Sequence, residues 1–395
     1  MQLNQKNFAI IDFTASKKYF HQYPLIIGLS NILMKNGYSS QILLPINADK
    51  GEIEQANKNI KYILDSGESS RNYKPFRHFI HKLILFSNNS NLSLEFIKKI
   101  LRRSYIKSSL RYLNKFDQDK INHIIFPTLD PLALELAAVI SKKSHMTNFF
   151  FYFRIVGRES RGVLASNSEL EKLLEMIDLF PNKIKIGVET DGYKSYLQNH
   201  GFSTSSLSWV PWPSLKSYAK DSTKTKNLTI GFLGCAKKRK GFDNIPKIVE
   251  TLKISGLIFN VLVQKANFPW LEYESSKNAM ISLMGDSLEM LPSSLDLTDL
   301  QKFIDKCDLL ILPYDSHSYA IGASGLMYHA CDSNIPIIVA KGVGFESEML
   351  AYEVGLSYTD VTEIPSLVRY LQSKKWQFLA YNDQRNDANQ KFLLE

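Results

Sequence analysis

Two short segments combine glycines with residues that could bind an anion. The first, GFLGCAKKRKGFD, places the four cations Lys237 to Lys240 between Gly234 and Gly241. The second, Tyr319 to Gly325, reads YAIGASG and leads into the apolar segment LMYHA. Each stands between a predicted strand and a predicted helix, where free backbone N–H groups and the helix dipole favour anions. We predict that both turns hold one anionic ligand, and a diphosphate suits them.

The predicted contacts come from both turns. Glycine permits sharp turns and close backbone approach, and Ser324 can also cap the helix that follows. The spacing is neither a dinucleotide fingerprint nor a P-loop, because the third glycine is misplaced and no Gly-Lys-Ser/Thr triplet occurs. A solvated basic turn and simple helix packing by small residues stay open as alternatives. The residues predicted to contact the anion are Gly234, Lys237, Lys238, Lys240, Gly241, Tyr314, Gly322, Ala323, Ser324 and Gly325.

Alternating strands and helices must position these turns. FAIIDF, SSQILLP, NHIIFP, NFFFYFRIV and NKIKIGV read as buried strands separated by helical patterns, and a second alternation runs from LTIGFLG to IPIIVA. Short joints of this kind imply parallel sheets. The Pro- and Trp-rich WVPWPS interrupts the alternation. We predict an α/β chain of two Rossmann-like, doubly wound domains at 1–212 and 213–374 facing an interdomain cleft, and a C-terminal helix within 375–395.

The net charge of +9 is concentrated in one segment. Residues 71–115 contain eleven Lys and Arg and one Glu, a net +10, so the rest of the chain sums to −1. The amphipathic, aromatic-rich helices predicted there could lie on an anionic membrane or pack on the domain with their charges solvated, and both readings stay open. No recognised nucleic-acid module appears, so we expect no nucleic-acid partner.

The expected cellular location of the protein is inferred from two features that the sequence lacks. We find no apolar run of the roughly 18 residues that a membrane span needs. The three cysteines are isolated and have no metal-ligand spacing, which favours a reducing compartment. We expect a cytoplasmic protein, placed at the inner face of the plasma membrane if segment 71–115 binds lipid.

Three segments resemble the C-terminal domain of GT-B glycosyltransferases, the retaining, family 4-like nucleotide-sugar group. They are FLGCAKKRKGFDNIPKIVETL, FIDKCDLLILPY and YAIGASGLMYHACDSNIPIIVAKGVG. The resemblance covers 228–345 well and the N-terminal half only in outline. It implies that Lys240, with Lys237 or Lys238, grips the donor diphosphate. The resemblance adds His329 to the predicted donor-binding residues, because His329 and Ile321 stand where the family usually has two acids. An imidazole accepts one hydrogen bond where a carboxylate accepts two, so His329 would hold a ribose hydroxyl more weakly. An ordinary helical histidine satisfied by a neighbour stays open as the alternative.

The resemblance also implies an acceptor side on the N-terminal domain, and it implies that the C-terminal helix of 375–395 returns to that domain. His21 is the candidate imidazole for the transferred sugar, with a solvated loop His as its alternative. Arg154 and Arg158 could grip an acceptor anion or the developing charge, and Lys240 completes the predicted catalytic set. Asp117-Gln118-Asp119 spells a metal-type triplet but reads as a solvated turn. Lysines can neutralise the diphosphate, so we expect no metal and no cofactor beyond the nucleotide-sugar substrate.

These inferences lead to one expected activity and one alternative. The first is a hexosyltransferase-type, retaining, metal-independent glycosyltransferase acting on a glycan acceptor, either a bacterial surface polysaccharide or a lipid-linked oligosaccharide. The alternative is a catalytically inactive GT-B homologue that acts as a binding or partner subunit, which the departures at His329 and Ile321 favour. The donor base, the sugar, the acceptor and the oligomeric state are not assigned by the sequence.

Overall fold

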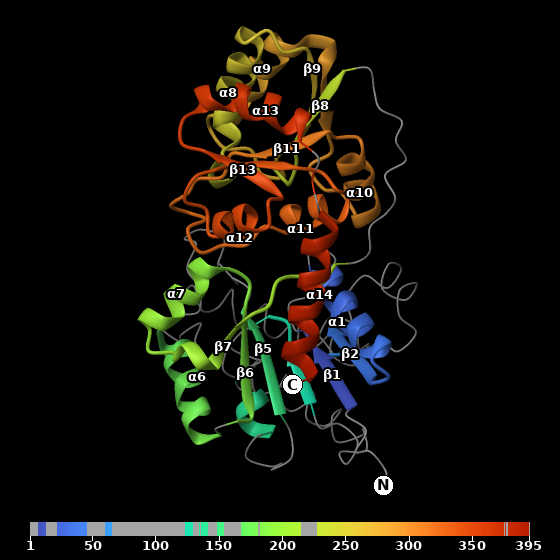
Figure 1. The fold of residues 1–395 in the computed structure, drawn as a ribbon, viewed down its shortest axis with the longest axis vertical. Coiled ribbons are helices and arrows are strands. Elements are labelled where there is room, and N and C mark those ends of the chain that lie inside the picture. Colours follow the sequence, from blue (N-terminus) through green and yellow to red (C-terminus); the bar gives the residue numbers. More distant parts are fainter. Residues whose placement is uncertain are drawn as a thin grey trace, which may run out of the picture. The chain divides into compact units, whose positions relative to one another are not determined.

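The computed structural model describes residues 7–12, 22–45, 60–64, 123–128, 134, 136–140, 148–153, 167–180, 182–214, 227–374, 376 and 378–394. The predictions for His21, Arg154, Arg158, the 117–119 triplet and the basic segment 71–115 lie outside these residues. The chain divides into two compact units, one of 1–188, 200–210 and 389–395 and one of 189–199 and 211–388. Figure 1 shows their elements.

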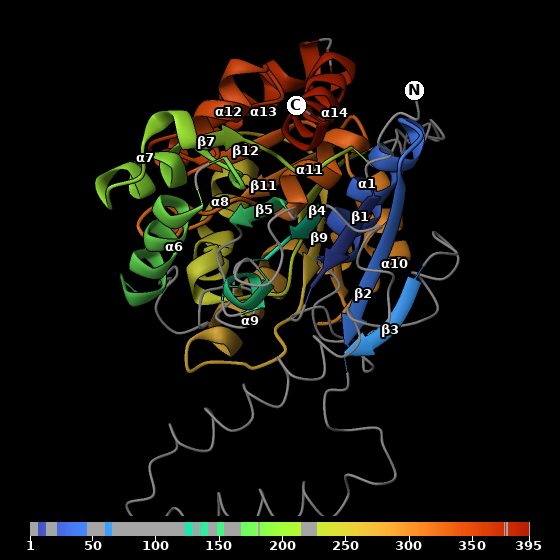
Figure 2. The same ribbon diagram turned by 90° about the horizontal axis from the view of Figure 1, so that it is seen from below.

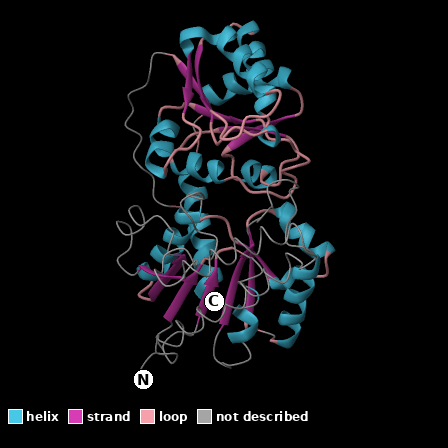
Figure 3. Cartoon of the chain, turned by 180° about the vertical axis from the view of Figure 1, so that it is seen from behind, coloured by secondary structure: helices cyan, strands magenta, loops and turns pink. Residues whose placement is uncertain are grey.

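The first unit contains a seven-stranded parallel sheet in the order β3-β2-β1-β4-β5-β6-β7. Its helices include α1 (Gln22–Lys35) and α6 (Asn167–Leu179). Figure 3 shows the strands side by side in magenta. The strands are β1 (Asn7–Ile11), β2 (Ser39–Pro45), β3 (Ile60–Leu64), β4 (His123–Phe126), β5 (Asn148–Phe153), β6 (Ile184–Val188) and β7 (Leu207–Trp209).

Continuous apolar runs explain this sheet. Phe8 to Ile11 in β1 and Ile42 to Leu44 in β2 are buried, as expected for central parallel strands that are covered on both faces. Helix α1 ends before Gly37, whose φ of 79° is the left-handed conformation predicted for its C-cap. The predicted strand SSQILLP coincides with β2.

The second unit contains a six-stranded parallel sheet in the order β10-β9-β8-β11-β12-β13. The chain moves outward from β8 to β10 and then returns to β11 at the other side of β8. The carboxyl ends of β8 and β11 therefore form the topological switch point, where open α/β sheets bind ligands. The strands are β8 (Leu228–Phe232), β9 (Phe259–Gln264), β10 (Leu288–Leu291), β11 (Leu309–Leu312), β12 (Ile337–Ala340) and β13 (Gly355–Tyr358).

Helices complete the second unit, and Figure 2 shows them from a second direction. Helices α8, α9 and α13 contribute to one apolar core with the sheet. Residues of α14 up to Ala388 group with this unit, as does all of α7. The helices are α7 (Asp191–Asn199), α8 (Ile245–Ile254), α9 (Tyr273–Met284), α10 (Leu297–Asp305), α11 (Gly325–Asp332), α12 (Glu346–Ala351), α13 (Ile364–Ser373) and α14 (Phe378–Leu394).

The predicted alternation of strands and helices is confirmed in both sheets. Helix α9 and strand β10 were not predicted, because α9 buries only Tyr273 and Met280 and so shows little helical periodicity. The division of the chain between Val210 and Pro211 falls two residues from the predicted boundary. None of the helices described is long and apolar enough to cross a membrane.

Candidate functional site

The first turn follows β8 and depends on two left-handed glycines. Gly234 has a φ of 86° and Gly241 a φ of 70°, a region that residues with a side chain rarely adopt. Lys238 to Lys240 form one 3-10 turn that ends at Gly241. A Cβ on Gly241 would lie 1.7 Å from the carbonyl oxygen of Pro313, so only glycine allows this approach to the end of β11.

The two predicted turns contact each other directly. The backbone N–H of Asp315 donates to the carbonyl oxygen of Arg239 at 3.1 Å. The Arg239 guanidinium lies 5.4 Å from the ring centre of Tyr319, and the Lys240 ammonium lies 5.6 Å from that of Tyr314. The sequence-based prediction that these strand-to-helix turns meet is confirmed, and they meet at the switch point of the sheet.

Lys240 lines a small pocket of about 20 Å³ that the first turn, the neighbouring strand ends and Tyr314 form, and none of Tyr319 to Gly325 lines it. A Cβ placed on Gly234 would lie 2.8 Å both from Lys240 Nζ and from Cδ1 of Leu326 in α11. In the described part of the chain, Lys240 makes no ion pair. Residues from the ends of β8, β9 and β11 line the pocket: Phe232, Leu233, Gly234, Ala236, Lys240, Phe242, Ile245, Gln264, Ile311, Pro313 and Tyr314.

The surroundings of Lys240 disfavour its charge. Burial lowers the pKa of Lys240, and the neighbouring cations Lys237 and Arg239 lower it further, while Tyr319 and Cys235 act in the opposite direction. An anion in the pocket would reverse this balance, because an opposite charge stabilises the protonated amine.

Tyr314 forms the wall of the pocket on the side of the second turn. Burial raises the pKa of Tyr314 to about 12, so its hydroxyl stays a neutral donor. That hydroxyl lies 3.4 Å from Oγ of Ser324. Ser324 has the extended backbone of an N-cap, but its side chain makes no capping hydrogen bond. Ser324 is therefore the N-cap residue of α11, as predicted, but its hydroxyl faces Tyr314 and does not bond the first turn of the helix.

The loop before α11 is held by contacts with residues 190–192, which the sequence analysis did not identify as part of the site. Thr190 Oγ1 donates to the carbonyl oxygen of Ile321 at 2.9 Å. A Cβ on Gly192 would lie 2.5 Å from the carbonyl oxygen of Ala320, so the start of α7 packs closely on this loop. Gly322 is buried within the loop, and Ala323 is partly exposed. Close packing on backbone atoms therefore holds the loop at Ala320 and Ile321.

His329 lies on a covered face of α11. Its side chain is 6% exposed and meets the ring of Trp212 edge-on at 6.3 Å between ring centres. Burial lowers the pKa of His329, so the imidazole is neutral near pH 7, and its Nε2 has no hydrogen-bond partner. A Cβ on Gly325 would lie 3.1 Å from the Trp212 ring. Gly325 thus serves helix packing, and His329 does not line the Lys240 pocket.

The four consecutive cations have different surroundings. Lys237 is partly buried and close enough to Lys240 to affect its pKa, and Arg239 covers Tyr319. The side chain of Lys238 is 69% exposed and lies 3.5 Å from Glu272. The structure brings Lys237, Arg239 and Lys240 together and turns Lys238 outward. Arg239 was missed, because sequence alone cannot say which members of a KKRK run share one side of a turn.

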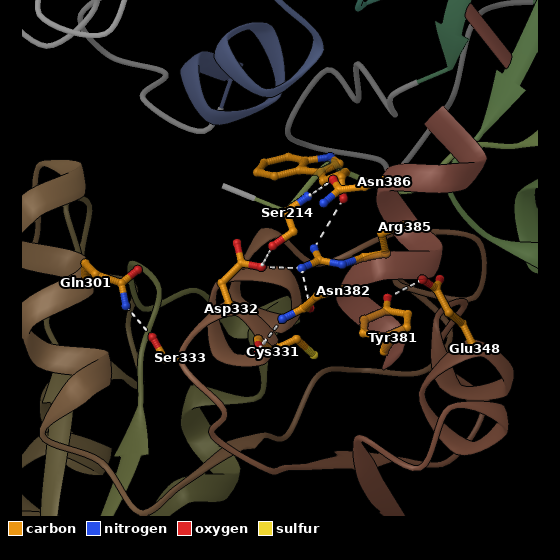
Figure 4. A network of polar contacts seen from close by, with 11 residues as sticks. Ser214, Gln301, Cys331, Asp332, Ser333, Glu348, Tyr381, Asn382, Arg385 and Asn386 are labelled. Atoms are coloured by element: carbon orange, nitrogen blue, oxygen red, sulfur yellow. Dashed lines mark hydrogen bonds and ion pairs between the residues drawn. The ribbon is translucent and has the colours of Figure 1, made fainter. Parts of the chain in front are cut away.

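A second buried cation, Arg385 in α14, is paired. Its guanidinium bonds the carboxylate of Asp332 and donates to the carbonyl oxygen of Trp212 at 3.2 Å and to Oδ1 of Asn382 at 2.7 Å. Asp332 also accepts a hydrogen bond from Ser214 at 2.7 Å. Figure 4 shows these groups converging at the C-terminal end of α11. The network ties α11 to α14 and to segment 211–214.

Comparison with known proteins supports the fold alone. No protein-family model matches the chain, and no curated protein matches it. Sucrose-phosphate synthase from Thermosynechococcus elongatus is similar with a TM-score of 0.61 and 10% identity, over 98% of this chain and 94% of that one. HepE from Anabaena, in complex with UDP, has a TM-score of 0.59 and 12% identity over 98% and 95% of the chains.

A third solved structure extends this likeness. The lipopolysaccharide outer core galactosyltransferase WaaB, in its apo form, has a TM-score of 0.54 and 11% identity, over 98% of this chain and 95% of that one. The similarity covers almost the whole chain in each case. Together with the two parallel sheets, these comparisons show that the chain has the GT-B fold of glycosyltransferases.

Proposed function

We propose that this chain is a glycosyltransferase that takes its sugar from a nucleotide diphosphate. The observation that carries the proposal is Lys240, a partly buried cation without an acid partner, at the switch point where both turns meet. A cation with a structural role is usually paired with an acidic side chain of the same chain. A cation that binds a ligand has no such partner until the ligand is present. HepE, which shares the fold, is known in complex with UDP, and this supports a nucleotide donor.

Each donor-site residue has a proposed task. Lys240, with Lys237 and Arg239 nearby, would neutralise the diphosphate. The backbone around Gly322 and Ala323 and the N-terminus of α11 would add N–H groups and the positive end of the helix dipole. Tyr314, held neutral by burial, could donate a hydrogen bond to an oxygen of the ligand. His329 would offer its unpartnered Nε2 to one ribose hydroxyl if the ribose reaches that face of α11.

Catalysis in this proposal rests on the leaving group. When the bond between the anomeric carbon and the diphosphate oxygen breaks, its electron pair stays on that oxygen and negative charge grows there. A cation that is already in place in a partly buried site stabilises such a developing charge more than bulk water does. His21, Arg154 and Arg158 remain the proposed contacts to the transferred sugar and the acceptor. A retaining, metal-independent transfer to a surface or lipid-linked glycan is proposed from the sequence resemblance.

A panel of nucleotides tests the donor half of the proposal. Thermal unfolding is recorded with UDP, GDP, ADP and CMP, and then with the matching nucleotide sugars. A diphosphate at 100 times its dissociation constant stabilises the folded chain by about 2.7 kcal/mol. We expect at least one nucleoside diphosphate to raise the melting temperature and the monophosphate to act more weakly. No stabilisation by any diphosphate would refute the proposal.

The second candidate is a binding subunit without catalysis. It is favoured by the neutral His329, which replaces an acid expected from the resemblance and is shielded by Trp212. Slow hydrolysis of the stabilising nucleotide sugar separates the two candidates. Release of free sugar that requires Lys240 supports the enzyme, whereas stabilisation without turnover supports the binding subunit.

A further inference from the structure

Thr190 connects the first turn of α7 to the loop before α11. The residue is buried, and its hydroxyl donates to the carbonyl oxygen of Ile321 at 2.9 Å. The oxygen of the same hydroxyl accepts from the backbone N–H of Tyr193 at 3.1 Å, as the side chain of an N-cap residue does. The start of α7 therefore orients this hydroxyl, and its single hydrogen is directed at the loop.

A second segment holds the same part of the loop. The backbone N–H of Gly344 donates to the carbonyl oxygen of Tyr319 at 2.7 Å. A Cβ on Gly344 would lie 2.8 Å from the carbonyl carbon of Ile321, so this residue also packs directly on the loop backbone. Ser347 Oγ donates to the carboxylate of Asp191 at 3.1 Å. Two segments that are bonded to each other therefore fix the start of the loop by its backbone.

The fixed residues come directly before the N–H groups that the proposed function assigns to the donor. Within the described ranges of the chain, the backbone N–H groups of Ala323, Ser324 and Gly325 donate no hydrogen bond. Ile321, whose carbonyl Thr190 holds, stands two residues before the first of them. Donors that are already in place bind an anion more tightly, because they need not be ordered at the moment of binding. A contact that fixes the Ile321 carbonyl therefore favours binding at the residues that follow.

We infer that Thr190 is a positioning residue of the proposed donor site, and this inference rests on the proposed function. Its hydrogen bond to Ile321 sets the course of the loop and holds the N–H groups of residues 323–325 in place for the diphosphate. Thr190 is buried and does not line the Lys240 pocket, so it acts through the loop and does not touch the ligand. The donor site thus depends on a residue that stands more than 120 positions before the loop, at 131 positions from Ile321.

Removal of one hydroxyl tests the inference in the full chain. Thr190→Val keeps the branched shape of the side chain and removes the donor, whereas Thr190→Ser keeps the hydroxyl. UDP is titrated by calorimetry, or GDP or ADP if either stabilises the unaltered chain more, at a temperature at which each variant is folded. Thr190→Val should bind about tenfold more weakly, and Thr190→Ser within about threefold of the unaltered chain.

The matched control is Thr251→Val. It removes the same group from α8, where Thr251 Oγ1 donates to the carbonyl oxygen of Lys247 at 2.8 Å. Neither residue lines the Lys240 pocket. This variant should bind the diphosphate as the unaltered chain does, because the hydrogen bond that it loses does not hold the loop before α11.

Hydrogen exchange separates positioning from a general loss of stability. In the ligand-free chain the N–H groups of Tyr319 and Gly322 are bonded, to Asp315 and Tyr319 respectively. Their exchange should be at least about fivefold faster in Thr190→Val, while exchange in α8 stays the same. A purely structural role would instead lower the melting temperature and leave the affinity of the folded chain unchanged. Thr190→Ala takes the place of the valine variant if the latter does not fold.

The outcomes distinguish this inference from the proposed function. The inference alone is overturned if the unaltered chain binds the diphosphate and Thr190→Val binds it equally well. Equal binding losses in the serine and valine variants, or unchanged exchange at Tyr319 and Gly322, also overturn it. If the unaltered chain binds no diphosphate, the proposed function fails and this inference fails with it.

Discussion

Lys240, which is partly buried, and Arg385, which is fully buried, are two cations of the same unit with opposite surroundings. Burial works against the charge of both. At Arg385 the carboxylate of Asp332 outweighs burial and raises the pKa, whereas at Lys240 burial and two nearby cations lower it. A buried charge with its partner in the chain is a structural element. A buried charge without one is kept at a cost in stability, and a ligand is the simplest reason for keeping it.

The largest expected effect comes from breaking the paired cation. Arg385→Met leaves the Asp332 carboxylate buried without its main partner, and this should lower the free energy of unfolding by about 3–5 kcal/mol. Chemical denaturation measures the loss. The double variant Arg385→Met, Asp332→Leu should recover much of it, because replacing both charges removes the unpaired group. A loss below about 1 kcal/mol in the single variant would contradict the structural role given to Arg385.

The next effect comes from separating the two turns. Gly241→Ala combines a strained left-handed residue with a contact to Pro313 that cannot be kept, so we expect a loss of about 2–4 kcal/mol in unfolding free energy and weaker nucleotide binding. Gly256→Ala is the control, because Gly256 has a φ of 79° but no atom within 4 Å of the added Cβ. Equal losses in the two variants would show that the turns need not touch.

The smallest expected effect is on pH dependence: UDP affinity should fall as pH rises, whereas the stability of the ligand-free chain should increase. Lys240 must be protonated to bind a diphosphate, so UDP affinity should fall as pH rises through its lowered pKa, below the value of about 10.4 for a free lysine. In the same range the stability of the ligand-free chain should gain from Lys240, because the unfolded state holds the proton more tightly. Calorimetry and denaturation from pH 7 to 10 measure both trends, and Lys240→Met should remove both.

The sequence predicted the parts of the site that depend on local pattern. Buried strands, glycine turns and the rule that parallel strands align their carboxyl ends were enough to bring the turns after β8 and β11 together. The sequence could not show which of the four adjacent cations lie on the same side of the turn, because the 3-10 turn that ends at Gly241 sets the directions of their side chains. The sequence identified Ser324 as the N-cap residue of α11, but it could not show that the hydroxyl of Ser324 lies beside Tyr314.

The paired cation left no trace in the sequence. Arg385 and Asp332 are 53 positions apart, and the sequence singled out neither as a site residue. Their ion pair depends on how α14 packs on α11, which is a property of the tertiary structure. The same holds for Thr190 and Gly192, which fix the loop before α11 from a distant part of the chain. Contacts of this kind need coordinates.

Titration of UDP into Lys240→Met and Lys238→Met by calorimetry tests the central claim most directly. Both variants remove one cation from the same turn, but only Lys240 lines the pocket at the ends of β8 and β11. We predict that Lys240→Met binds UDP at least about tenfold more weakly, a loss of about 1.4 kcal/mol or more, with unfolding free energy unchanged or higher. Lys238→Met should bind UDP within about twofold of the unaltered chain. Equal affinities in the two variants would contradict the account.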